Sequence, residues 1–217
     1  MSSSGSELAT LVSAIVGAVV AIRRSRRAQR TIARLDVLAL RKPINKAPVA
    51  VLGGLLGALT YDKFGLSLEM VAYGLMIAMC IEQSIIDYTT HRLPRGVTFR
   101  AAIIGGPLLA LAAINHDDNG RIGVMFASFI VTLVLFALLA ALSKGGIGGG
   151  DVRLAPVLAM FIGWLGASHV YIGLGSGFIL GGIAAAGMLI TRCASASTRI
   201  AFGPFLCIGA VIALLVQ

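Results

Sequence analysis

Long apolar runs constrain this chain more than any other feature of its sequence. Residues 122–142 and 170–190 contain no charged side chain, and a helix that crosses a bilayer needs about 20 such residues. The whole chain is 58% hydrophobic and 12% charged, with a mean hydropathy of +0.94. Soluble domains have about 25% charged residues. A chain so poor in polar side chains cannot cover itself with a polar surface, so its solvent is lipid.

The apolar segments predict one all-α, polytopic membrane helix bundle of about eight transmembrane helices. We treat residues 1–217 as a single integral membrane domain, because no change in composition marks a second one. Three glycines in the seventh segment, Gly173, Gly177 and Gly181, share a helix face and predict a close helix contact, for which packing inside the bundle is favoured over a dimer interface. The predicted spans are residues 8–22, 47–61, 66–86, 97–114, 122–142, 152–166, 170–190 and 200–216.

Basic residues indicate the orientation of this bundle. With the N-terminus outside, the cytoplasmic loops are residues 23–46, 88–100, 143–153 and 191–199, and they hold 16 of the 18 Lys and Arg residues. Cytoplasmic loops of membrane proteins carry an excess of Lys and Arg, so this membrane topology is favoured. Nine of these residues fall in 23–46, which we interpret as a basic cytoplasmic loop on anionic membrane lipid. This segment permits a helix up to Leu40 and is then broken by Pro43 and Pro48. Docking of a partner or substrate there stays open.

The net charge of +9 would suggest nucleic acid as a partner of a soluble protein. Here the charge lies in short loops between apolar segments, without interleaved aromatic residues, so no nucleic-acid partner is predicted. Cys80, Cys193 and Cys207 are widely spaced and form no Cys-x-x-Cys motif. The sequence therefore predicts no metal site.

Two aspartates carry the chemical signal. Asp87 follows the third predicted span and Asp151 precedes the sixth, so the predicted membrane topology places both on the cytoplasmic side. Periodicity alone does not show that they face each other. If they do, charge repulsion and partial burial would leave the pair with one shared proton. That arrangement is typical of aspartic proteases, in which one carboxylate activates water while the other protonates the carbonyl.

The segment before the second aspartate is rich in glycine. Gly148 and Gly150 lack a Cβ atom, so a backbone or an extended peptide can approach Asp151 closely. A flexible connector is the plainer explanation of the same composition, and the glycines alone do not decide between them.

Three motifs resemble those of the type IV prepilin peptidases, and the similarity runs from about Val71 to the C-terminus. The first is similar to the family's first aspartate motif and has proline seven positions after the aspartate. The second is similar to the family's Gly-x-Gly-Asp motif, and the third to its final helix. They are IDYTTHRLP (residues 86–94), GGGDVRL (148–154) and FGPFL (202–206).

This resemblance implies an aspartic endopeptidase in the cytoplasmic membrane of a bacterium. Such enzymes remove the short basic leader from prepilins and pseudopilins at the cytoplasmic face. By the same resemblance Asp87 and Asp151 are the catalytic pair, Pro94 ends the first loop, and Arg153 lies beside the second aspartate.

The chain also departs from the larger family members. They have paired Cys-x-x-Cys motifs in an N-terminal region, and this chain has none, so it resembles the short forms and no zinc is expected. Larger members also methylate the new N-terminus with S-adenosylmethionine. No residue here supports or excludes that activity, so a cofactor is expected only if methylation is retained. The sequence does not indicate an oligomeric state.

Glu82 precedes Asp87 by five positions and falls within the third predicted span. An acid inside a membrane segment is costly and is seldom without a role. It could adjust the charge of the aspartate pair or bind a basic leader residue. It could equally be a buried acid that is hydrogen-bonded to Gln83, Ser84 or nearby backbone.

Three other functions are compatible with intramembrane acids. A proton-coupled transporter or channel is disfavoured, because its halves would show a repeat and its acids would lie at the midplane. Presenilin-like proteases share Gly-x-Gly-Asp but have Tyr-Asp and Pro-Ala-Leu motifs, where this chain has Ile86-Asp87 and Gly203-Pro204-Phe205. An inactive relative that only binds pilin precursors is disfavoured by the presence of both aspartates.

Overall fold

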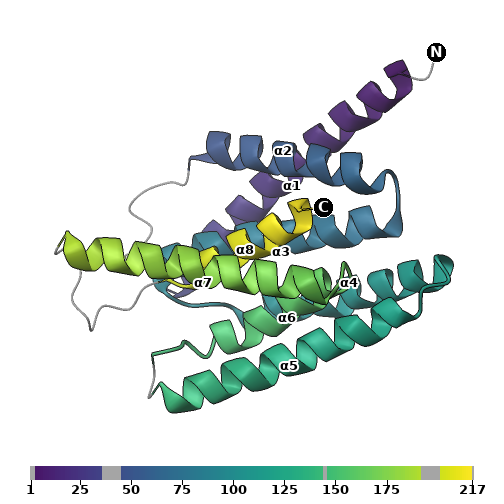
Figure 1. Cartoon of the computed structure of the whole chain (residues 1–217). Helices are drawn as coiled ribbons and strands as arrows, with labels where there is room; N and C mark the ends of the chain where they lie inside the picture. The colour runs from purple at the N-terminus through teal and green to yellow at the C-terminus, as the bar shows by residue number, and fades with distance from the viewer. Residues whose placement is uncertain (1–2, 36–44, 144–145, 192–200, 217) are drawn as a thin grey trace.

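The computed structural model describes residues 3–35, 45–143, 146–191 and 201–216. These residues form eight helices and no strand, which confirms the predicted all-α bundle of about eight helices (Figure 1). The helices are α1 (Ser3–Leu35), α2 (Lys46–Phe64), α3 (Leu68–Thr90), α4 (Arg95–Asn115), α5 (Gly120–Leu142), α6 (Asp151–Gly163), α7 (Ala167–Ile190) and α8 (Gly203–Leu215).

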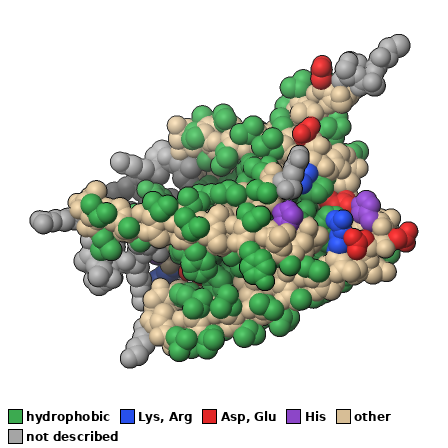
Figure 2. Space-filling model, viewed as in Figure 1, with side chains coloured by type: hydrophobic (Ala, Val, Ile, Leu, Met, Phe, Trp, Pro, Cys, Tyr) green, Lys and Arg blue, Asp and Glu red, His purple; other side chains and the backbone are tan. Residues whose placement is uncertain are grey.

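Five of these helices, α1, α3, α4, α5 and α7, are long and apolar enough to cross a membrane, and α8 is a shorter apolar helix. Hydrophobic side chains spread over the visible face of the molecule, whereas charged ones gather mainly toward one end (Figure 2). Large apolar side chains such as Val131, Ile179 and Ile183 are exposed on α5 and α7. Such a surface suits lipid, so the chain is a multi-pass membrane protein.

The first half of the basic segment is helical. α1 is 33 residues long and continues through residues 23–35 without a break, in agreement with a segment that permits a helix up to Leu40. A helix of this length extends for about 50 Å, which is longer than the roughly 30 Å hydrocarbon core. The physical reason is that arginine and alanine favour a helix, and no proline or glycine interrupts this stretch. Residues 36–44 of the predicted loop lie outside the described residues.

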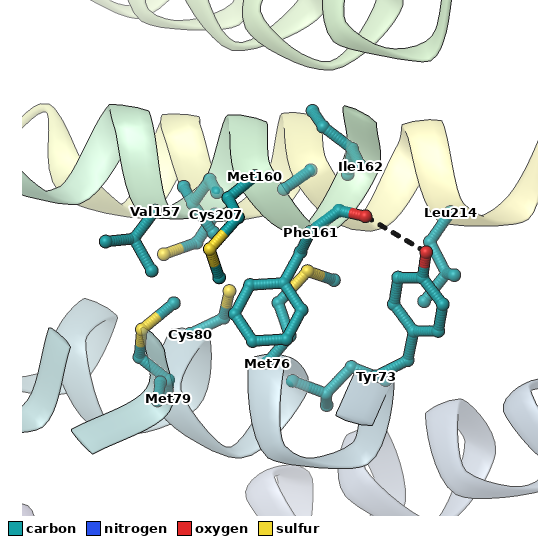
Figure 3. Packing of buried hydrophobic residues seen from close by; sticks show 14 of the residues in the cluster. Tyr73, Met76, Met79, Cys80, Val157, Met160, Phe161, Ile162, Cys207 and Leu214 are labelled. Atoms are coloured by element: carbon teal, nitrogen blue, oxygen red, sulfur yellow. Dashed lines mark hydrogen bonds between the residues drawn. The ribbon is translucent and has the colours of Figure 1, made fainter. Parts of the chain in front are cut away.

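α3 lies at the centre of the bundle and packs against α6 and α8. The Tyr73 hydroxyl on α3 donates a hydrogen bond to the Phe161 carbonyl oxygen on α6 at 3.0 Å (Figure 3). Cys80 of α3 and Cys207 of α8 are buried in the same cluster as small apolar side chains. Cys193 lies outside the described residues. This packing fixes α6 and α8 relative to α3, which carries the first aspartate.

The glycine face of α7 packs inside the bundle, as predicted. A Cβ atom at Gly173 would lie 3.1 Å from the Ala213 Cβ, and one at Gly177 would lie 3.1 Å from the Phe205 carbonyl oxygen. Both neighbours belong to α8, so the two helices approach backbone to backbone. This contact holds α8 along its whole length.

Polar contacts close the end of the bundle where α2 and α8 finish. The Lys63 ammonium group donates hydrogen bonds to the carbonyl oxygens of Leu214 and Val216 at 2.7 and 2.9 Å. At the same end, Glu69 in the first turn of α3 lies next to His116, which follows the end of α4, and their Oε1 and Nε2 atoms are 2.6 Å apart. The opposite end of the bundle carries the start of α8 and, with it, both aspartates.

Candidate active site

The first aspartate lies in the last turn of α3. Asp87 is only 5% exposed. The helix ends at His91, whose φ of 51° is left-handed and whose backbone N–H donates to the Asp87 carbonyl oxygen at 2.8 Å. The chain then turns, and Pro94 is the residue that precedes α4. A left-handed residue ends the helix one turn after the aspartate, so the carboxylate stays at the end of the bundle.

Gln83 holds this turn in place. It lies one helical turn before Asp87, is fully buried, and donates from its side-chain amide to the Pro94 carbonyl oxygen at 3.2 Å and to the Thr98 hydroxyl at 2.7 Å. These bonds fasten the start of α4 to α3. From the sequence, Gln83 was expected only as a possible hydrogen-bond partner of Glu82, and no motif indicates its contacts with Pro94 and Thr98.

The second aspartate begins α6. The backbone N–H of Asp151 donates to the Gly148 carbonyl oxygen at 2.9 Å, so the glycine segment is a tight turn into the helix. The Asp151 side chain is buried, and its Oδ1 atom accepts no hydrogen bond from the described residues. A Cβ atom at Gly150 would lie 2.7 Å from the Leu93 Cβ, which shows how closely this turn packs on the α3–α4 turn.

The start of α8 supplies a contact that the sequence analysis missed. The Gly203 backbone N–H donates to the Asp87 Oδ2 atom at 3.0 Å. The free N–H groups of a helix start stabilise a nearby negative charge. The only available signal was the similarity of residues 202–206 to a family motif, because nothing in the local pattern connects Gly203 with a residue 116 positions away.

Both aspartates line one cavity of about 520 Å³ at this end of the bundle. Its walls come from the ends of α1 and α3, the start of α4 and the glycine turn before α6. Of the residues predicted for the site, Asp87, Asp151, Pro94, Gly148, Gly150 and Arg153 all line it. The other lining residues are Thr31, Leu35, His91, Arg92, Leu93, Arg95 and Gly149.

Asp151 has an unusual affinity for protons. It lies outside the five candidate membrane spans. Burial, reinforced by the negative charge of Asp87, raises its pKa to about 7, although a hydrogen bond from the Gly148 backbone acts in the opposite direction. An acid with this pKa is about half protonated near neutral pH, whereas an ordinary carboxyl is ionised there.

Glu82 does not line this cavity, and it is a buried acid, as one of the two interpretations expected, but with a different partner. Its carboxylate accepts a hydrogen bond at 2.9 Å from the Arg24 guanidinium of α1, and its side chain is 1% exposed. A position five residues before Asp87 points about 140° away from it around the helix, because successive residues turn by about 100°. Glu82 therefore faces α1 instead of the aspartate pair.

Metal-ligand groups are not clustered in the part of the chain that the structure describes. No three His, Cys, Asp or Glu side chains lie together there in a way that would hold an ion. The cavity combines two carboxylates with one imidazole, His91, and three guanidinium groups.

Comparison with known proteins places the chain in a family. The sequence profile of the type IV leader peptidase family matches residues 73–216, which include both aspartates and Gly203. The chain belongs to this family. A family member from Bacillus subtilis (strain 168), named prepilin leader peptidase/N-methyltransferase, is 26% identical over 156 residues. That alignment covers 70% of this chain and 58% of the relative, so the chain spans well under two thirds of it. No solved structure matches the chain.

Proposed function

We propose that this protein is an aspartic endopeptidase that removes the basic leader peptide from type IV prepilins or similar precursors. One observation carries the proposal: two buried carboxylates from distant parts of the chain line the same cavity, and the pKa of Asp151 is raised to about 7. The family membership and the name of the Bacillus relative support the substrate class.

The two carboxyls divide the reaction between them. Asp87 accepts the Gly203 N–H and is the ionised partner, and it removes a proton from the attacking water. Asp151 is protonated and donates its proton to the carbonyl oxygen of the scissile peptide. The water oxygen bonds to the carbonyl carbon, which gives a gem-diol. The C–N bond then breaks as the leaving amine receives the proton that Asp87 took, and one hydroxyl of the gem-diol returns a proton to Asp151, which leaves a carboxylic acid. Since the pair titrates together, these roles describe one protonation state of it.

The proposed setting is the cytoplasmic face of a bacterial membrane, with the N-terminus outside. The charge distribution supports this orientation, and the cavity lies at the same end as the basic half of α1. The proposed mechanism requires no metal ion. Methylation of the new N-terminus, the second activity in the relative's name, would require S-adenosylmethionine, and no described residue is assigned to it.

The raised pKa predicts a pH dependence of cleavage. The reaction needs Asp151 protonated, and a group with a pKa of about 7 loses its proton as the pH rises through that value. We expect kcat/KM to fall about tenfold for each pH unit well above 7 and to change little just below it. Cleavage by the purified enzyme across pH 5–9 measures this. A rate that keeps rising above neutral pH would contradict the assignment of Asp151 as the acid.

The direct test is cleavage of tagged precursors. The chain is co-expressed with a panel of prepilins and pseudopilins, and mass spectrometry identifies the new N-terminus and shows whether it is methylated. We expect cleavage at the junction of the basic leader and the apolar segment, with no loss after treatment with a chelator. Failure to cut any precursor in membranes that contain the folded protein would refute the proposal, and inhibition by the chelator would refute the metal-independent mechanism.

A further inference from the structure

The cytoplasmic half of α1 has no assigned role. The family profile matches residues 73–216, so α1 lies entirely outside it. Nevertheless, Thr31 and Leu35 of α1 line the cavity together with Asp87 and Asp151. A part of the chain that the family comparison does not cover thus contributes a wall of the site.

One face of α1 makes all of these contacts. Arg24, Ala28, Thr31 and Leu35 follow one another at helical spacing, which places them on the same side of the helix. Ala28 and the adjacent Ile32 are buried against Ile86, the residue before Asp87. The apolar contact therefore brings α1 directly beside the first aspartate.

An ion pair fastens this face to α3. Arg24 donates to Glu82 at 2.9 Å, and the Glu82 side chain is almost completely buried. The other arginines of α1, at positions 23, 26, 27, 30 and 34, are exposed, and no carboxylate among the described residues pairs with them. If Arg24 were removed, a buried carboxylate would be left without a partner, so the helices would separate or admit water at this point.

We propose that the cytoplasmic half of α1 is a substrate-binding wall of the active site, which Arg24 and Glu82 hold in position. The inference rests on the proposed function and extends it. Leu35 and Thr31 contact the precursor peptide, whereas Arg24 and Glu82 are positioning residues that touch neither the peptide nor the reacting atoms. Displacement of this wall weakens binding of the peptide but leaves the aspartates, which belong to α3 and α6, able to react.

Kinetics of purified variants test the ion pair. We expect Arg24→Ala to raise KM about tenfold while kcat changes less than about threefold. Arg26→Ala, an exposed arginine on the same helix, is the matched control and leaves KM unchanged. Each single change, Arg24→Glu or Glu82→Arg, should raise KM. The double variant, in which the two charges are exchanged, should bring KM back toward the wild-type value. An Arg24→Ala enzyme with wild-type KM would overturn the proposal.

Photocrosslinking tests the wall even if the ion-pair variants accumulate poorly. p-Benzoylphenylalanine replaces Leu35, which lines the cavity, or Arg30, which is exposed on another face of α1. We expect the precursor to crosslink at position 35 and not at position 30. Equal labelling at both positions, or none at 35, would overturn the proposal. Because crosslinking reports binding and wild-type cleavage is measured in parallel, a failure of the proposed peptidase activity is distinguished from a failure of the wall.

Discussion

Replacement of either aspartate by asparagine, in Asp87→Asn or Asp151→Asn, is expected to reduce precursor cleavage by about 10³-fold. Asparagine keeps the shape of the side chain but can neither accept the proton of water nor donate one to the carbonyl oxygen. Because the two carboxyls act as a unit, the double variant should be no slower than the slower single variant. Single-turnover cleavage of a tagged precursor by purified enzyme provides the measurement.

Asp62→Asn is the matched control for these variants. Asp62 is exposed near the end of α2, at the opposite end of the bundle from the cavity, and this change should leave the rate within about twofold. The thermal unfolding midpoint of each variant in detergent shows whether a slow enzyme is also a folded one. If Asp87→Asn or Asp151→Asn retained full activity in the folded state, the two-carboxylate mechanism would be wrong.

Gly203→Ala is expected to slow cleavage by about 10²-fold. A Cβ atom at this position would lie 2.8 Å from the Asp87 Oδ2 atom, which is closer than a methyl group tolerates, and 3.1 Å from the Leu93 Cδ2 atom, which is a tight contact. Either α8 or the aspartate must therefore move, and a displacement of about 1 Å at reacting groups costs about this much in rate. The backbone of Gly203 is not in the left-handed region, so the effect comes from contact and not from backbone strain.

Gly182→Ala provides a glycine control for this prediction. Gly182 lies on α7, and a Cβ atom there would meet no other atom within 4 Å, so activity and stability should match the wild type. Over-packing in a tight site costs about 1–3 kcal/mol, which the thermal midpoint of Gly203→Ala will record. A Gly203→Ala enzyme with the wild-type rate would show that the close approach of α8 to Asp87 is not needed for the reaction.

Much of the fold could be predicted because the signals are local. A membrane helix satisfies its own backbone hydrogen bonds, so its presence depends on the apolarity of about 20 consecutive residues and not on partners elsewhere. The same local logic predicted the glycine face of α7. At residues 23–35 the sequence permitted a helix, but only the structure shows that α1 continues unbroken through the basic residues.

The contacts around the aspartates could not be predicted in the same way. The motifs identified Asp87 and Asp151 as candidates, but the Gly203 N–H that reaches Asp87 comes from 116 positions away. Glu82 was interpreted from its distance to Asp87 along the chain, whereas its partner is Arg24 on a helix 58 positions earlier. Contacts of this kind depend on how helices rotate and cross, and a linear pattern contains little information on either.

By itself, the sequence determined that the chain lies in a membrane and about how many helices it forms, since these follow from composition and from the lengths of the apolar runs. Short motifs determined which aspartates are the candidates for the site. The tertiary structure decided which side chains meet. It brought Asp87 and Asp151 to one cavity, placed the start of α8 against Asp87 and added α1 as a wall. The physical reason is that helix formation in a membrane is a local process, whereas the protonation and positioning of a buried acid depend on every element packed around it.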